Sequence, residues 1–253
     1  MIDVHCHLEH QDYSGDRDSV IQSCKKELKA VVTCCANPKD LALTMDLVEK
    51  YKNFVFCTCS IHPIYIKEIS REDVKKFFDL LRENKDRIVG IGETGLDYYW
   101  IKEEKWREKQ KELFIEHITL ARELNKPLVI HARDSYEDCV EILEKENAKL
   151  VDLHMFGGRK LIDRVIENGW YVSMNAILLK SKNHKKIIRD MPLERIMLET
   201  DSPWLAPDGG RNTPLTIRRV AEKIAEIKKV AFNEVWKTCA ENAIDFFNLP
   251  ITL

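Results

Sequence analysis

Apolar and β-branched residues gather along this chain in eight short runs, and longer, more polar segments separate the runs. Short apolar runs of this kind are typical of buried strands, above all when both faces of the sheet are covered. The pattern predicts strands over residues 2–5, 30–35, 54–59, 88–93, 127–131, 150–154, 170–174 and 196–199.

Most of the segments between these runs carry helical periodicity. Over residues 106–124, apolar residues recur at steps of three and four, which places them on one face of a helix. Nearer the C-terminus, Thr213-Pro214 predicts a helix start, and Asn233 is a candidate cap for the last helix. Strands that alternate with helices predict right-handed crossovers and a parallel sheet.

A parallel sheet of this kind can close into a barrel or stay open and doubly wound. An open sheet would gather ligands at one switch point, whereas polar candidates here follow strands 1, 4, 5, 6 and 8. The length of 253 residues is near the usual size of a closed barrel. We therefore predict an α/β fold with one TIM (β/α)8 barrel domain over residues 1–253 and its site at the C-terminal mouth of the strands.

Histidines and carboxylates stand at the ends of five of these runs. His5 and His7 lie two residues apart, so an extended strand points both imidazoles to the same face. Glu93 follows an apolar run, where a buried carboxylate is costly unless a cation accompanies it. His131 and His154 each end a run of their own. Taken singly, each of these side chains could instead serve only the core or a turn, but together they predict a site for two divalent ions.

Asp201 lies where the last strand meets its loop, just before Pro203. An aspartate there could simply cap a turn. In the catalytic interpretation, Asp201 ligates the first ion and accepts a proton from the metal-bound water, so that hydroxide attacks near neutral pH. Glu93 would bridge both ions through its two oxygens. Asp201 and Glu93 are therefore the candidate catalytic residues.

Further polar residues are candidate substrate contacts. His62 follows the third predicted strand, and Arg133, Arg159 and Arg211 lie in loops that follow strands. The planar guanidinium of arginine suits phosphate oxygens, although loop arginines are often only solvated. A local positive charge would matter here, because 40 basic and 42 acidic residues leave a formal net charge of only -2.

The remaining features of the sequence indicate a cytoplasmic protein. The first residues carry no basic and apolar leader pattern, and no uncharged apolar stretch approaches the length of a bilayer span. Eight cysteines form no CxxC pair, and several fall in predicted strands. We expect them to be buried free thiols in a reducing compartment rather than disulfides.

The ordered motifs of the chain resemble those of the TatD family of metal-dependent deoxyribonucleases, within the amidohydrolase-like barrels. The resemblance covers nearly the whole chain and rests on Ile2-Asp3-Val4-His5-Cys6-His7-Leu8, Ile61-His62-Pro63, Gly90-Ile91-Gly92-Glu93-Thr94-Gly95-Leu96-Asp97-Tyr98-Tyr99, Ile130-His131-Ala132-Arg133, His154-Met155-Phe156-Gly157-Gly158, Glu199-Thr200-Asp201-Ser202-Pro203-Trp204-Leu205 and Arg211-Asn212-Thr213-Pro214. It departs from many relatives at His62-Pro63-Ile64, where they place a second histidine, and at Ser60.

The resemblance implies a divalent-metal centre and hydrolysis of phosphodiesters, commonly as a 3′-to-5′ exonuclease on DNA. Carried over by position, it implies one ion held by His5, His7, Glu93 and Asp201, a second held by Glu93, His131 and His154, and substrate contacts from His62, Arg133 and Arg211. The expected partner is DNA with single-stranded regions or 3′ ends, and no obligate protein partner or membrane is expected.

Two other functions stay open at this point. A related barrel hydrolase could act on a small phosphoester, lactone or amide, because this scaffold hosts many chemistries. A protein that only binds metal or nucleic acid is the other alternative. Imidazole with carboxylate suits Zn, Mn, Fe, Co or Ni, whereas a Mg site is more often dominated by oxygen ligands.

Overall fold

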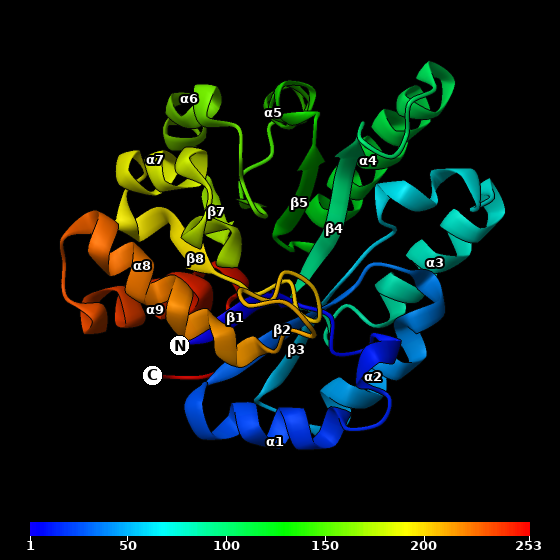
Figure 1. Ribbon diagram of the computed structural model, residues 1–253. Helices are drawn as coiled ribbons and strands as arrows, with labels where there is room; N and C mark the ends of the chain where they lie inside the picture. The colour runs from blue at the N-terminus through cyan, green and yellow to red at the C-terminus, as the bar shows by residue number, and fades with distance from the viewer.

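The computed structural model describes all 253 residues. Its strands form one parallel sheet in which each strand pairs with the next along the chain. They are β1 Ile2–Cys6, β2 Ala30–Cys35, β3 Val55–Cys59, β4 Gly90–Asp97, β5 Leu128–Arg133, β6 Val151–Leu153, β7 Tyr171–Met174 and β8 Ile196–Leu198. The sheet curls into a nearly closed barrel, which confirms the predicted fold class (Figure 1).

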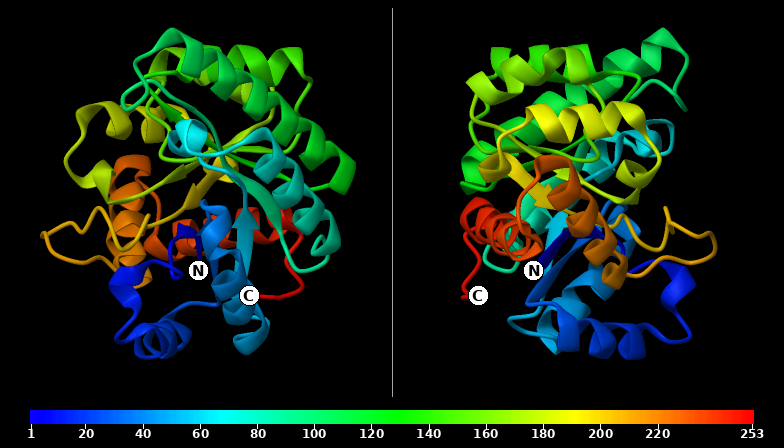
Figure 2. Two further views of the ribbon diagram at one scale, coloured as in Figure 1. Left: turned by 90° about the vertical axis from the view of Figure 1, so that its right-hand side faces the viewer. Right: turned by 60° about the vertical axis from the view of Figure 1, so that its left-hand side comes forward.

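Helices follow the strands and surround the sheet on its outer side (Figures 1 and 2). They are α1 Arg17–Glu27, α2 Leu41–Lys50, α3 Arg71–Glu83, α4 Glu104–Leu124, α5 Tyr136–Lys145, α6 Ile162–Glu167, α7 Lys182–Asp190, α8 Ile217–Lys228 and α9 Phe232–Phe247. None of these helices combines the length and the apolar composition that a membrane span requires.

Hydrogen bonds just beyond β8 join the last strand to the first. The amide of Asp201 donates to the carbonyl of His5 at 2.9 Å, and the amide of His7 donates to the carbonyl of Ser202 at 2.7 Å. The buried carboxylate of Asp3 accepts from the Thr200 hydroxyl at 2.6 Å and from its amide at 3.1 Å. These bonds hold the loop after β8 against β1, so they fix Asp201 beside the two histidines of the first strand.

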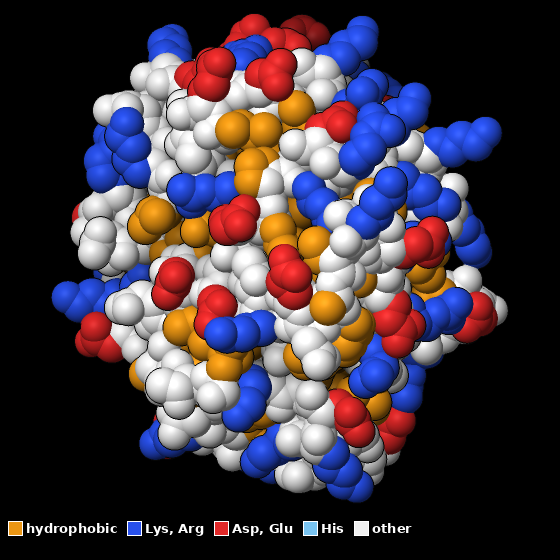
Figure 3. Space-filling model, turned by 90° about the vertical axis from the view of Figure 1, so that its left-hand side faces the viewer, with side chains coloured by type: hydrophobic (Ala, Val, Ile, Leu, Met, Phe, Trp, Pro, Cys, Tyr) orange, Lys and Arg blue, Asp and Glu red, His pale blue; other side chains and the backbone are white.

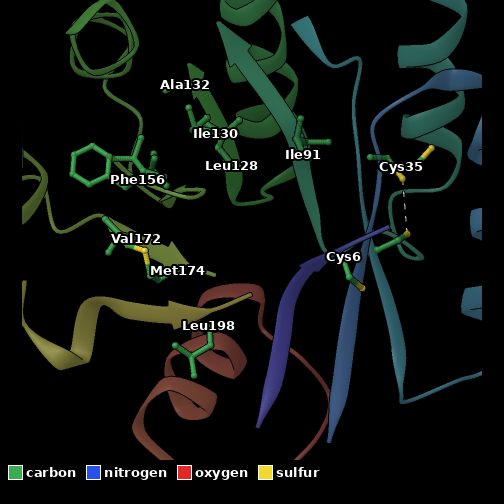
Figure 4. Packing of buried hydrophobic residues seen from close by; sticks show 14 of the residues in the cluster. Cys6, Cys35, Ile91, Leu128, Ile130, Ala132, Phe156, Val172, Met174 and Leu198 are labelled. Atoms are coloured by element: carbon green, nitrogen blue, oxygen red, sulfur yellow. Dashed lines mark hydrogen bonds between the residues drawn. The ribbon is translucent and has the colours of Figure 1, made fainter. Parts of the chain in front are cut away.

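Alternation along each strand decides which side chains face the helices and which face the barrel interior. On β5, Leu128 and Ile130 belong to the large buried cluster under the helices, and Figure 4 shows them among its members. Val129 and His131 take the opposite face of the same strand. On β5, the face towards the helices is thus apolar, while the inner face becomes polar at the carboxyl end of the strand.

Two boundaries differ from the sequence-based expectation. Strand β4 does not end at Glu93 but continues to Asp97, because it stays paired with β5 after a register shift between Ile91 and Thr94. The predicted cap at Asn233 is wrong, since α9 is already helical at Phe232 and its N-cap residue makes no side-chain cap bond.

The start predicted at Thr213-Pro214 holds only as a short 3-10 turn, Pro214–Thr216, which leads directly into α8. The turn keeps proline in the first helical position, where its missing amide hydrogen costs nothing. Figure 3 shows both acidic and basic side chains on the face built by the later helices. This mixing matches the small net charge.

Candidate metal centre

The predicted ligands converge at the carboxyl ends of the strands. His5 lies on β1, Glu93 on β4 and His131 on β5, while His154 and Asp201 follow β6 and β8. They meet because all strands of the barrel run in the same direction and end at one mouth. All are buried or nearly so, since the exposed fraction of their side chains does not exceed 16%.

Four of these side chains form a first group around the end of β1. The Nε2 atoms of His5 and His7 lie 3.2 Å apart, and His5 Nε2 lies 3.4 Å from Glu93 Oε2. Asp201 Oδ1 completes the group at 3.7 Å from His5 Nε2 and 3.5 Å from His7 Nε2. The buried thiol of Cys34 belongs to the same neighbourhood, with its sulfur within 4.8 Å of the donor atoms of His5, His7 and Glu93.

A second group surrounds the other oxygen of Glu93. His131 Nδ1 lies 2.6 Å from Glu93 Oε1, His62 Nε2 lies 3.4 Å from it, and His154 Nε2 lies 3.7 Å from it. The rings of His5 and His154 stack with centres 4.0 Å apart, so the two groups are contiguous. Glu93 therefore presents one oxygen to each group, which is the arrangement that a bridging carboxylate requires.

Carboxylates behind the histidines fix the orientation of three of the rings. Glu9 Oε1 lies 3.0 Å from Nδ1 of His7, and Glu199 Oε2 lies 2.7 Å from Nδ1 of His154. A histidine that ligates a metal commonly gives its other ring N–H to a carboxylate in this way, and the contact fixes the tautomer. In both residues this leaves Nε2 facing the centre as an acceptor.

In His131 the two ring nitrogens exchange these roles. Its Nε2 lies 2.9 Å from Asp97 Oδ2, which leaves Nδ1 to face Glu93. His5 lacks such a partner, because its buried Nδ1 makes no hydrogen bond. From the sequence alone, Glu9, Asp97 and Glu199 had no predicted role. Each stands two or four residues from a ligand along the chain. In an extended segment, such residues lie on the same face as the ligand, and this alternation was the signal that could have identified them.

The electrostatics of the site fit a bound cation. Every basic group paired with Glu93 or Asp201 is a histidine, and no lysine or arginine reaches either carboxylate. Burial raises the pKa of Glu93, but His62, His154 and His131 outweigh it and hold the pKa well below its usual range. The pKa of Asp201 is lowered in the same manner, chiefly by His7. Both carboxylates are thus ionised and buried, a state that needs positive charge nearby.

Protons on the imidazoles supply that charge when no ion is bound. Burial alone would lower the pKa of His154, but Glu199 and Glu93 raise it to about 10. Burial also acts to lower the pKa of His131, but Glu93 and Asp97 outweigh this effect and raise the pKa to about 9. A divalent ion would take the place of these protons, since only the neutral imidazole can ligate. The donor set of imidazole nitrogens and carboxylate oxygens fits Zn, Mn, Fe, Co or Ni.

The candidate substrate residues are distributed differently. His62 lies within the second group, with its ring centre 4.3 Å from that of His131. Arg133 is exposed, and its guanidinium carbon lies 3.9 Å from the ring centre of Tyr99. Arg211 pairs with Asp16 at 2.6 Å and lies outside the group of ligands. The role of these three residues as substrate contacts stays a prediction.

Arg159, the other candidate loop arginine, pairs with Asp190 on α7 at 3.2 Å. All eight cysteines are free and buried, as the sequence suggested. Burial raises the pKa of the Cys34 thiol well above its usual range, with further contributions from Glu93 and Glu9. The thiols therefore act as packing residues, and Cys34 is the cysteine whose sulfur lies within 4.8 Å of donor atoms of the candidate ligands.

Comparison with known proteins places this centre in a family. A family model described as TatD related DNase matches residues 2–248. The chain is 34% identical to the uncharacterized metal-dependent hydrolase YabD of Bacillus subtilis over 98% of this chain and 99% of that protein. It is 31% identical to human deoxyribonuclease TATDN3 over 98% of this chain and 94% of that protein.

A solved structure gives the same result for the fold. The crystal structure of YjjV, a TatD homolog from Escherichia coli K12, superimposes with a TM-score of 0.90 at 22% identity, over 99% of this chain and 98% of that chain. The match of family model, relatives and fold extends over the segments that carry the ligands. This chain belongs to the TatD family of metal-dependent hydrolases.

Proposed function

We propose that this protein is a divalent-metal-dependent deoxyribonuclease that removes nucleotides from the 3′ ends of single-stranded DNA. The observation that carries the proposal is the division of six ligands into two groups that share Glu93, because two-ion centres of this kind promote hydrolysis of phosphodiesters. The names of the family model and of human TATDN3 support DNA as the substrate.

The whole of residues 1–253 would act as one domain. Eight buried free thiols suit the reducing cytoplasm, where we place the activity. The first group, with His5, His7, Glu93 and Asp201, would hold one ion, and the second group, with Glu93, His131 and His154, would hold the other. His154 lies between the two groups, since its donor atom is also within 4.8 Å of those of His5 and Asp201. When bound, the two ions would polarise the phosphoryl oxygen and make water more acidic at neutral pH.

Asp201 is the best placed proton acceptor for the attacking water. Its side chain is 16% exposed, whereas that of Glu93 is 6% exposed, so solvent from the mouth reaches the aspartate first. Its lowered pKa keeps it ionised and ready to accept a proton at neutral pH. The water oxygen would add to phosphorus while its proton passes to Asp201, the bond from phosphorus to the leaving oxygen would break, and that oxygen would take a proton from solvent water.

Glu93 would fix the two ligand groups relative to each other, and His62 would position the substrate phosphate. Glu93 orients four histidines through its two oxygens, which fixes the spacing of the two groups. His62 caps the turn after β3 by accepting from the amide of Ile64 at its Nδ1, so its Nε2 faces the centre. There it would contact a phosphate oxygen bound between the two groups.

The test is digestion of oligonucleotides labelled at the 5′ end by protein loaded with one metal at a time. Single-stranded DNA should shorten stepwise from its 3′ end, and a chelator should stop the reaction. Asp201→Asn should abolish turnover, because the amide cannot accept the proton. Asp208→Asn is the matched control, since Asp208 lies on the same loop but pairs with Arg219 at the surface.

The result also separates the alternatives. Turnover of a small phosphoester, lactone or amide with no release of nucleotides would show the same centre acting on a different substrate. DNA binding that survives chelation, with no turnover in any divalent metal, would overturn the hydrolytic proposal altogether.

A further inference from the structure

Large apolar side chains are exposed mainly on two loops at the mouth of the barrel. Trp100 is 61% exposed and Tyr99 43% exposed after β4, and Trp204 is 43% exposed and Leu205 39% exposed after β8. These four are the majority of the seven large apolar residues that the surface exposes. Exposed aromatic residues gathered beside a site commonly mark a place where a ligand binds. Figure 2 shows the second loop, in orange, projecting from the body of the molecule.

Each loop is tied to one of the two ligand groups. The ring of Trp204 lies against that of His7, with centres 4.7 Å apart and planes at 65°. The amide of Trp100 donates to Asp97 Oδ1 at 2.7 Å, and the other oxygen of Asp97 holds His131 at 2.9 Å. The Trp204 ring therefore lies beside the first group, and the backbone of Trp100 is anchored beside the second.

Basic side chains accompany the aromatic residues after β4. The guanidinium carbon of Arg133 lies 3.9 Å from the ring centre of Tyr99 and 5.7 Å from that of Trp100. The ammonium of Lys102 lies 5.2 Å from the ring centre of Tyr99. Neither Arg133 nor Lys102 forms a salt bridge with a carboxylate, so the positive charge of both side chains is available to a ligand. Positive charge interleaved with aromatic faces is the composition that binds single-stranded nucleic acid.

We propose that these two loops are a base-stacking site for the end of a single nucleic-acid strand. Trp100, with Tyr99 and Arg133, takes the base on one side of the scissile phosphate, and Trp204 takes the base on the other side. The proposal rests on the proposed nuclease function and deepens it by naming the residues that would bind the unpaired bases of the substrate. Bases in a duplex are already stacked on their neighbours, so only an unpaired end offers free faces to both indoles.

The test compares Trp100→Ala and Trp204→Ala with Leu80→Ala, a control that removes an exposed apolar side chain from α3 on the outer side of the barrel. Binding of a fluorescently labelled single-stranded oligonucleotide is measured by anisotropy, and cleavage is measured on the same oligonucleotide. Each tryptophan variant should lose roughly 5- to 150-fold in affinity, the range that base–aromatic stacking gives per base. The control should match the unmodified protein.

An abasic nucleotide supplies the second arm of the test. Removing the base on one side of the scissile phosphate should weaken binding to the unmodified protein by the same factor as the corresponding tryptophan variant. Combining the variant with its abasic substrate should add little, because both changes remove one contact. The abasic substrate can be measured with the unmodified protein, so this arm remains informative even if Trp204→Ala disturbs His7. The conservative variant Trp204→Phe should restore most of the affinity.

The outcomes separate this proposal from the proposed function. Cleavage of oligonucleotides that depends on neither tryptophan nor on the flanking bases overturns the stacking site and leaves the nuclease intact. Failure of the unmodified protein to bind or cleave any oligonucleotide overturns both. Tight binding that depends on the two tryptophans, without cleavage in any metal, supports the stacking site and overturns the nuclease.

Discussion

Replacing Glu199 by glutamine tests how the structure holds the second ligand group. Glu199 is fully buried, and its Oε2 accepts from the Ser173 hydroxyl at 2.6 Å and lies 2.7 Å from His154 Nδ1. Its Oε1 accepts from the side-chain amide of Asn175 at 2.8 Å. Both oxygens of Glu199 are therefore acceptors, and glutamine can supply only one.

Either orientation of the new amide creates a conflict. If the NH2 group of glutamine faces His154, two donors meet unless the ring changes tautomer, which would place hydrogen on the Nε2 that must ligate. If the NH2 group faces Asn175, it meets another NH2 group, and Asn175 resists turning because its oxygen accepts from the amide of Ile177 at 3.1 Å. Loss of such a carboxylate behind a ligand typically weakens metal binding about 10- to 100-fold, which corresponds to roughly 1.4–2.7 kcal/mol.

The assay is competition for metal against a chelating dye, with one metal at a time. The binding step of the second group should shift by that factor in Glu199→Gln, because Glu199 holds His154, and turnover should recover when excess metal is added. Glu222→Gln, on the exposed face of α8, is the control and should bind like the unmodified protein. A folded Glu199→Gln protein whose two metal affinities are unchanged would refute the assignment of Glu199 as the residue that positions His154.

Three further predictions follow from other parts of the structure. Glu9→Gln should weaken the other binding step by a similar factor, because Glu9 holds Nδ1 of His7, and metal competition should show the step affected. Addition of metal at about 100 times its Kd should stabilise the fold by about 3 kcal/mol, and removal with a chelator should lower Tm by roughly 5–10 °C in a thermal melt. The buried ring of His117 has its pKa lowered by burial to about 4, against 6.5 in the unfolded chain, so the unfolded chain binds the proton first on acidification. The contribution of the neutral His117 ring to stability should therefore be complete above pH 6.5 and fall by about 3 kcal/mol as the pH drops towards 4. Urea unfolding of the metal-free protein should show a shallower fall in His117→Gln, and an equal fall in both proteins would count against the buried neutral ring.

Much of the fold could be predicted because a parallel barrel needs strands that are buried on both faces, and such strands stand out as short apolar runs. The convergence of His5, Glu93 and His131 could be predicted for a related reason, since the ends of parallel strands meet at one mouth. The predicted cap at Asn233 was wrong because asparagine favours the cap position in general, whereas here the chain enters α9 from Ala231 in an extended conformation. Local propensity gave way there to packing of the helix.

Contacts between distant segments could not be predicted from one sequence. Arg211 pairs with Asp16, nearly two hundred positions away, and no local pattern reports that contact. The carboxylates behind the histidines are equally non-local, as Glu199 meets His154 only because β6 and β8 flank β7. The alternation of residues in an extended segment narrows the choice of such partners, but the register of the strands decides it.

The central claim is that Glu93 is shared by two ions, and anomalous diffraction from crystals loaded with a single transition metal tests it most directly. The account predicts two peaks on either side of the Glu93 carboxylate, about 3.5–4 Å apart, one beside His5 and His7 and the other beside His131 and His154. A single peak, or a pair of peaks that leaves Glu93 outside both coordination spheres, would contradict it.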